Sequence, residues 1–142
     1  MQKTIWPACA GESSQQEASD CTVRALANAA PMPYADAHAL LSKHGRKFRH
    51  GATFTVYHAA YLEAGLTLHG IFGETRRAVF AGRHCGQTRM AGITLGRLLP
   101  RLRTGRWIVL ITGHALAVVD GKVIDSGGSR AGSHVFSLYR AP

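Results

Sequence analysis

Cys21 is the residue of this sequence that is best placed to act as a nucleophile. It directly follows Asp20, a residue type that favours the N-cap of a helix, and a helical pattern begins at Cys21 itself. The first N–H groups of a helix lack partners within the helix and, with the helix dipole, favour negative charge. We therefore predict a lowered pKa for the Cys21 thiol and a reactive thiolate, the alternative being an unreactive structural cysteine.

A histidine that could serve Cys21 stands at the start of a predicted β-hairpin. Apolar strands are expected over 114–119 and 122–125, and Asp120-Gly121 between them is typical of a two-residue turn. Such a turn pairs Val119 with Lys122, which fixes the register of the whole hairpin.

This register places His114 and Asp125 on the same face of the hairpin, as diagonal neighbours. Diagonal Cβ atoms lie at most ~7–8 Å apart, within reach of an imidazole–carboxylate hydrogen bond. Asp125 can then fix the tautomer of His114 and leave its other ring nitrogen for a thiol. The alternative is a histidine at a strand end and an aspartate in a turn that have no joint role.

The elements that must position these residues form an α+β pattern, in which N-terminal helices pack on a C-terminal antiparallel β-sheet. Helices are predicted over 21–30, 34–43 and 53–64, with a short one after Thr94 that Pro100 ends or distorts. A strand is predicted over 67–72, a loop over 74–92, and further strands over 107–111, 114–119, 122–125 and 134–139. The first helix should bury one apolar stripe, formed by Val23, Leu26, Ala27 and Ala30. Cys21, Arg24 and Asn28 lie off that stripe.

The segment Gln15-x-x-x-x-Asp20-Cys21 followed by a helix resembles the active-site segment of papain-like cysteine peptidases. It is most similar to the bacterial peptidases that remove double-glycine leaders from bacteriocins. His114 opens an apolar strand and Asp125 closes the next one, which keeps that family's order of cysteine, histidine and acid. The likeness covers roughly residues 15–30 and 105–128. Thr22 stands where the leader peptidases usually have glycine, and Ser126 stands where they often have proline.

The resemblance implies a papain-like fold and acyl transfer on a peptide, isopeptide or amide bond. Cys21 would attack the carbonyl, and His114 would protonate the leaving group and then activate water. Gln15 would donate to the oxyanion together with the backbone N–H of Cys21, and Gln16 is the alternative if the loop register shifts by one. An acyl transferase with the same architecture is a second possibility. The chain also resembles small bacteriophage proteins, which suggests a bacterial or viral source.

The composition is that of a globular domain rather than a membrane protein. The chain has 142 residues, 46% of them hydrophobic, and we expect a single domain over 1–142. No apolar run reaches the ~20 residues of a membrane span, and the N-terminus does not resemble a secretory signal. We therefore expect a cytoplasmic protein, in the host cytoplasm if it is viral. Metal-ligand spacing and nucleotide-binding glycine patterns are missing, so we expect no metal and no cofactor. Cys85 is a weaker candidate nucleophile, and Cys9 lies in a predicted loop.

The net charge of +9 and the pI of about 10.2 favour an acidic partner. Basic residues cluster over 43–49, 76–89 and 97–106. Nucleic acid, an acidic membrane surface or an acidic protein could bind them, or they could form a soluble surface with no ligand. A catalytically idle binding module that keeps the fold and uses its basic face is therefore another hypothesis.

Overall fold

The computed structural model describes residues 19–72, 89–90, 92–124 and 130–142. Its helices are α1 (Cys21–Ala29), α2 (Tyr34–Lys43), α3 (Phe54–Glu63) and α5 (Leu95–Leu98), which continues into the 3₁₀ turn η1 (Leu99–Arg101). Its strands are β1 (Thr67–Phe72), β2 (Arg89–Met90), β3 (Arg106–Ile111), β4 (His114–Val119), β5 (Lys122–Ile124) and β6 (Val135–Arg140). The predicted α+β class is confirmed, and Pro100 lies where the short helix tightens into the 3₁₀ turn.

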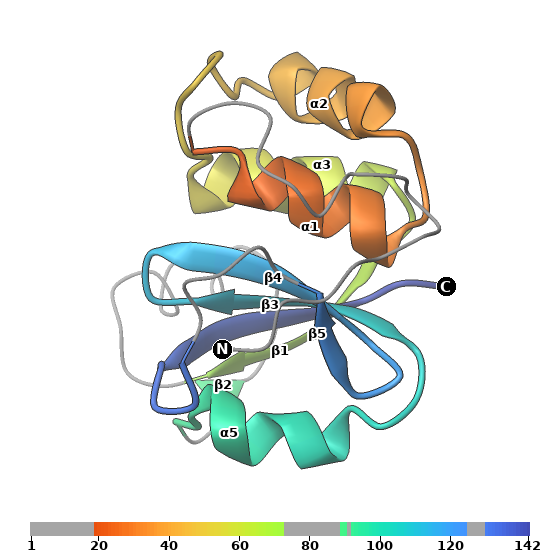
Figure 1. The fold of residues 1–142 in the computed structure, drawn as a ribbon. Helices are drawn as coiled ribbons and strands as arrows, with labels where there is room; N and C mark the ends of the chain where they lie inside the picture. The colour runs from red at the N-terminus through yellow and green to blue at the C-terminus, as the bar shows by residue number, and fades with distance from the viewer. Residues whose placement is uncertain (1–18, 73–88, 91, 125–129) are drawn as a thin grey trace.

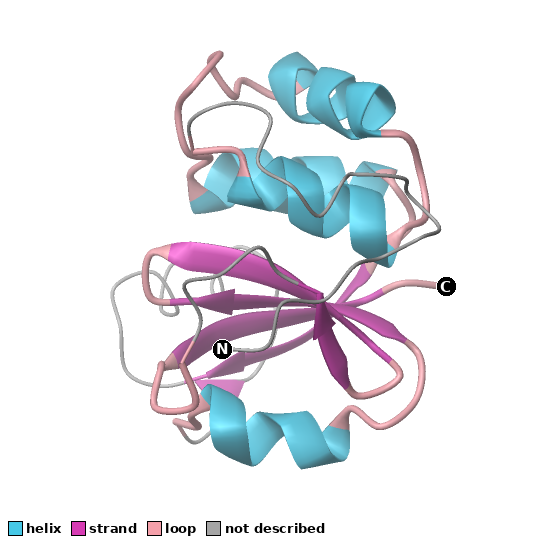
Figure 2. Ribbon diagram, in the orientation of Figure 1, coloured by secondary structure: helices cyan, strands magenta, loops and turns pink. Residues whose placement is uncertain are grey.

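The strands form one sheet in the order β2-β1-β6-β3-β4-β5. All neighbouring pairs are antiparallel apart from β1 and β2, which are parallel. Helices α1, α2 and α3 cover one face, and α5 covers the other (Figures 1 and 2). Strand β2 corrects the prediction of a loop over 74–92, whose residues 74–88 and 91 lie outside the described residues. None of the described helices is long and apolar enough to cross a membrane.

Strands β3 and β4 are buried on both faces because the sheet has a hydrophobic core on each side. Ile108, Leu110, Ala115 and Ala117 pack in the core beneath α1, α2 and α3. The alternate residues Val109, Ile111, Leu116 and Val118 pack in the core beneath α5. A strand covered on both faces needs apolar residues at nearly every position, which explains the continuous apolar runs.

Helix α1 is buried around its whole circumference, which the sequence pattern did not indicate. Val23, Leu26 and Ala27 are fully buried as predicted, whereas Ala30 follows the last residue of the helix and is only partly buried. Arg24 and Asn28, predicted to lie off the stripe, are only 8% and 1% exposed. The reason is that α1 packs against β4 on one side and against α2 on another, so no side of it faces solvent. Asn28 satisfies part of its polar surface by donating from Nδ2 to the carbonyl of Arg24, at 2.8 Å.

The β4–β5 hairpin has the register that the sequence predicts. Asp120 and Gly121 have φ angles of 49° and 83°, the positive values of a type I′ turn. Val119 pairs with Lys122, and the ladder continues to the pair of Ala117 with Ile124. Asp125, the next residue of the chain, lies outside the described residues.

Candidate active site

Cys21 and His114 come together where the start of α1 meets the start of β4. Both are partly buried and both line a cavity of about 170 Å³. The rest of its lining comes from the second residue of α1, the segment before α3, α3 itself and the β3–β4 hairpin: Thr22, Gly51, Ala52, Tyr57, Leu110, Ile111, Gly113 and Ala115. Two residues far apart in the sequence therefore share one small opening.

The pKa of the Cys21 thiol is lowered from its ordinary value of 9.0 by the groups that surround the sulfur. Burial acts in the opposite direction and raises this pKa, because a thiolate loses its hydration. Burial is the largest single effect, but a side-chain hydrogen bond with His114, a backbone hydrogen bond from Ala115 and the positive charges of His114 and Arg24 together outweigh it. The lowered pKa agrees with the sequence prediction. The prediction attributed it to the start of the helix, however, whereas His114 makes the largest lowering contribution in the structure.

The strand geometry explains how Ala115 can donate to the sulfur. Ile111 pairs with His114 across a two-residue turn, so the next pair, Leu110 with Ala115, is of the non-hydrogen-bonded kind. The N–H of Ala115 therefore points away from β3, toward the side of β4 on which β5 pairs. The described β4–β5 pairs end at Ala117, so they do not include Ala115. As the first residue of β4, His114 lies beside the turn, where its ring can reach the start of α1.

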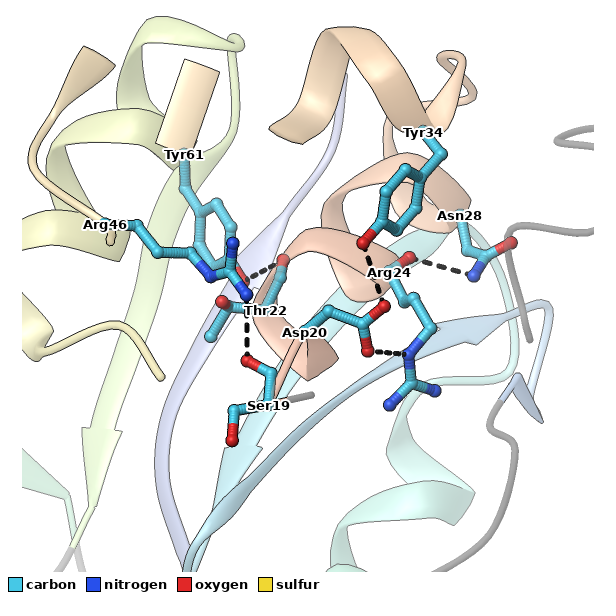
Figure 3. Close-up of polar contacts among 8 residues, drawn as sticks. All are labelled: Ser19, Asp20, Thr22, Arg24, Asn28, Tyr34, Arg46 and Tyr61. Atoms are coloured by element: carbon cyan, nitrogen blue, oxygen red, sulfur yellow. Dashed lines mark hydrogen bonds and ion pairs between the residues drawn. The ribbon is translucent and has the colours of Figure 1, made fainter. Parts of the chain in front are cut away.

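Asp20 does not cap α1 through its side chain, which corrects the sequence prediction. It holds the N-cap position but makes no side-chain cap hydrogen bond. Instead Oδ1 accepts from Nε of Arg24 at 2.7 Å, and Oδ2 accepts from the hydroxyl of Tyr34 at 2.9 Å (Figure 3). Because both Asp20 and Arg24 are buried, a charge-assisted hydrogen bond between them is stronger than a cap to a neutral N–H.

Two further side chains fix the backbone on either side of Cys21, and neither was predicted. Arg46 donates from Nη2 to the carbonyl of Ser19 at 3.2 Å, and Ser19 has a positive φ of 57°. Tyr61 donates to the carbonyl of Thr22 at 2.9 Å (Figure 3). Arg46 and Tyr61 come from distant parts of the chain, and no local sequence signal points to these contacts.

The remaining predicted site residues, Gln15, Gln16 and Asp125, lie outside the described residues, as do Cys9 and Cys85. Their placement stays a prediction. Within the described ranges, no group of three or more histidine, cysteine, aspartate or glutamate side chains could hold a metal ion.

Comparisons of the chain with protein-family models, with curated proteins and with solved structures found no match in any of the three.

Proposed function

We propose that the chain is a thiol-dependent hydrolase of papain-like type that cleaves a peptide, isopeptide or amide bond. The observation that carries the proposal is the hydrogen bond between His114 and the Cys21 thiol, which lines a cavity and has a lowered pKa despite its burial. A thiolate is a strong nucleophile, and an imidazole within hydrogen-bond reach supplies the proton transfers that acyl chemistry requires.

In the proposed reaction, the Cys21 thiolate attacks the substrate carbonyl carbon, a C–S bond forms and the carbonyl oxygen becomes an oxyanion. The backbone N–H of Cys21, at the start of the helix, is one donor for that oxyanion, and the family resemblance adds Gln15. The intermediate collapses, the C–N bond breaks, and the imidazolium of His114 protonates the leaving amine. His114 then takes a proton from water, which attacks the thioester and releases the thiolate. Asp125 would orient the imidazole.

The test is the rate at which a neutral thiol reagent modifies Cys21, followed by mass spectrometry of the peptide that contains it. His114→Ala should slow this modification strongly at neutral pH, whereas His69→Ala should leave it unchanged. His69 is the matched control because it is exposed and lies on β1, where it contacts Trp107. Once a substrate is known, Cys21→Ala should lower turnover by about 10⁴–10⁶. An unchanged modification rate in His114→Ala would contradict an activated nucleophile.

A binding module is the second candidate, and the charge distribution favours it. Arg97 is exposed on α5, which lies on the sheet face opposite α1, and Arg101 and Arg103 are exposed shortly after α5 in the chain. This candidate predicts binding of nucleic acid or an acidic protein that weakens steeply with salt and does not change in Cys21→Ala.

An acyl transferase with the same catalytic residues is distinguished by an added amine that accepts the acyl group faster than water does.

A further inference from the structure

The segment between α2 and α3 forms one rim of the Cys21 cavity. Gly51 and Ala52, at its end, line the cavity directly. The residues before them are basic: Lys47, Arg49 and His50 are exposed, and the buried Arg46 holds the backbone before Cys21. Residues 44–53 contain no aspartate or glutamate. The segment itself therefore carries an excess of basic residues.

The same segment presents an aromatic side chain to solvent. Phe48 is 66% exposed, and its ring contacts the edge of His38 at a centroid distance of 6.3 Å. His38 in turn lies 5.9 Å from Tyr34, whose hydroxyl binds Asp20 beside the nucleophile. These three rings form an aromatic strip that leads from the basic segment to the start of α1. One exposed phenylalanine is common on a protein surface, but this one continues a strip whose last ring binds Asp20, the residue before Cys21.

We infer that the segment 47–50 binds the substrate, and that the substrate is a peptide with an apolar side chain next to acidic residues. The inference rests on the proposed function and names the substrate class of the same site. Carboxylates complement the charges of Lys47 and Arg49, and an apolar side chain covers the exposed ring of Phe48. A peptide fits better than nucleic acid because a thiolate attacks carbonyl carbon, and the segment is followed at once by Gly51 and Ala52 in the lining of the cavity that holds Cys21.

The experiment uses peptidyl acyloxymethyl ketones that share one reactive group and one leucine. Glu, Gln or Lys is placed in turn at each neighbouring position, and the rate of covalent labelling of Cys21 is measured. At one or more positions, the Glu probe should label Cys21 about five- to tenfold faster than the Gln probe at low salt, with the Lys probe slowest. The difference should shrink at about 0.5 M salt, where the Debye length falls to a few ångströms.

Variants assign the preference to the segment. Lys47→Gln combined with Arg49→Gln should reduce the Glu-over-Gln ratio to about one to two, and Lys47→Gln alone should reduce it partly. Lys122→Gln combined with Arg130→Gln is the matched control, since both residues are exposed and neither lies on the segment. Phe48→Ser should remove the preference for leucine over alanine in the same probes. The thermal unfolding of each variant shows whether its fold is retained.

Equal labelling by Glu and Gln probes at every position would overturn the inference, as would a preference that survives in the Lys47/Arg49 double variant. A second outcome would assign the segment to nucleic acid instead. In that case a single-stranded deoxyoligonucleotide slows labelling only when Lys47 and Arg49 are present, and the charge of the peptide probe has no effect. Labelling that depends on His114 but not on probe charge rejects this inference alone. Labelling that is independent of His114 rejects the proposed function as well.

Discussion

Replacement of Asp20 by Asn should lower the free energy of unfolding by about 3–5 kcal/mol, because it breaks a buried ion pair from one side. The side chain of Asp20 is 0% exposed and that of Arg24 is 9% exposed, with 2.7 Å between Oδ1 and Nε. The Asn variant keeps nearly the same shape but leaves the guanidinium of Arg24 without this carboxylate. The weakened bond from Tyr34 contributes about 1 kcal/mol or less to the loss. The melting temperature should therefore fall by roughly 10 °C.

Urea denaturation, followed by circular dichroism, measures this loss, and three variants serve as controls. Tyr34→Phe removes only one hydrogen bond and should cost about 1 kcal/mol. Lys43→Gln breaks an ion pair with Glu63 on the surface, where the side chains of Lys43 and Glu63 are 63% and 41% exposed, and should leave the stability almost unchanged. Asp20→Asn combined with Arg24→Met should cost less than the sum of the two single variants. A loss below about 1 kcal/mol for Asp20→Asn would refute the assignment of this pair as a buried, stabilising interaction.

Two predictions concern pH. Because the pKa of Cys21 is lowered in the folded state, the unfolded chain binds more protons between that pKa and 9.0. The free energy of unfolding of the protein relative to that of Cys21→Ala should therefore rise with pH across this window, and this added stability should be lost as pH falls through the folded pKa. A difference in unfolding free energy that does not change with pH in urea denaturation would contradict this. Burial raises the pKa of Tyr61 well above 10.0, with smaller effects from Cys21 and Tyr57. Tyr61→Phe should cost about 1 kcal/mol at neutral pH and become less unfavourable above pH 10.0, where only the unfolded tyrosine ionises; a cost that stays constant at high pH would disprove it.

The parts of the site that could be predicted from sequence are those fixed by local interactions. Proline residues separate two short periodic segments, so the bounds of α1 and α2 follow closely from the pattern. Asp120-Gly121 determines the hairpin register because a two-residue turn allows little variation, and the pairs of β4 and β5 agree with it. The position of His114 in that hairpin was therefore predictable.

The contacts that hold the nucleophile could not be predicted, because they join distant segments. Arg46 reaches Ser19 from the loop after α2, and Tyr61 reaches Thr22 from α3. Periodicity describes only one helix at a time, so it placed Arg24 off the buried stripe. In the fold α1 packs against β4, β3 and α2, and Arg24 becomes a buried partner of Asp20.

The state of the Cys21 thiol depends on a balance that neither the helix start nor the sheet sets alone. Burial in the cavity opposes ionisation of the thiol. Without the hydrogen bonds from β4, the helix dipole would have to overcome this burial, and it is typically worth only ~0.3–1 kcal/mol. The hydrogen bond to His114 is the largest effect in the other direction, and the N–H of Ala115 follows it. Both come from the first two residues of β4, so the same strand end that brings the imidazole also supplies the second donor. It follows that the reactivity of Cys21 should respond more to changes at the β3–β4 turn than to changes along α1.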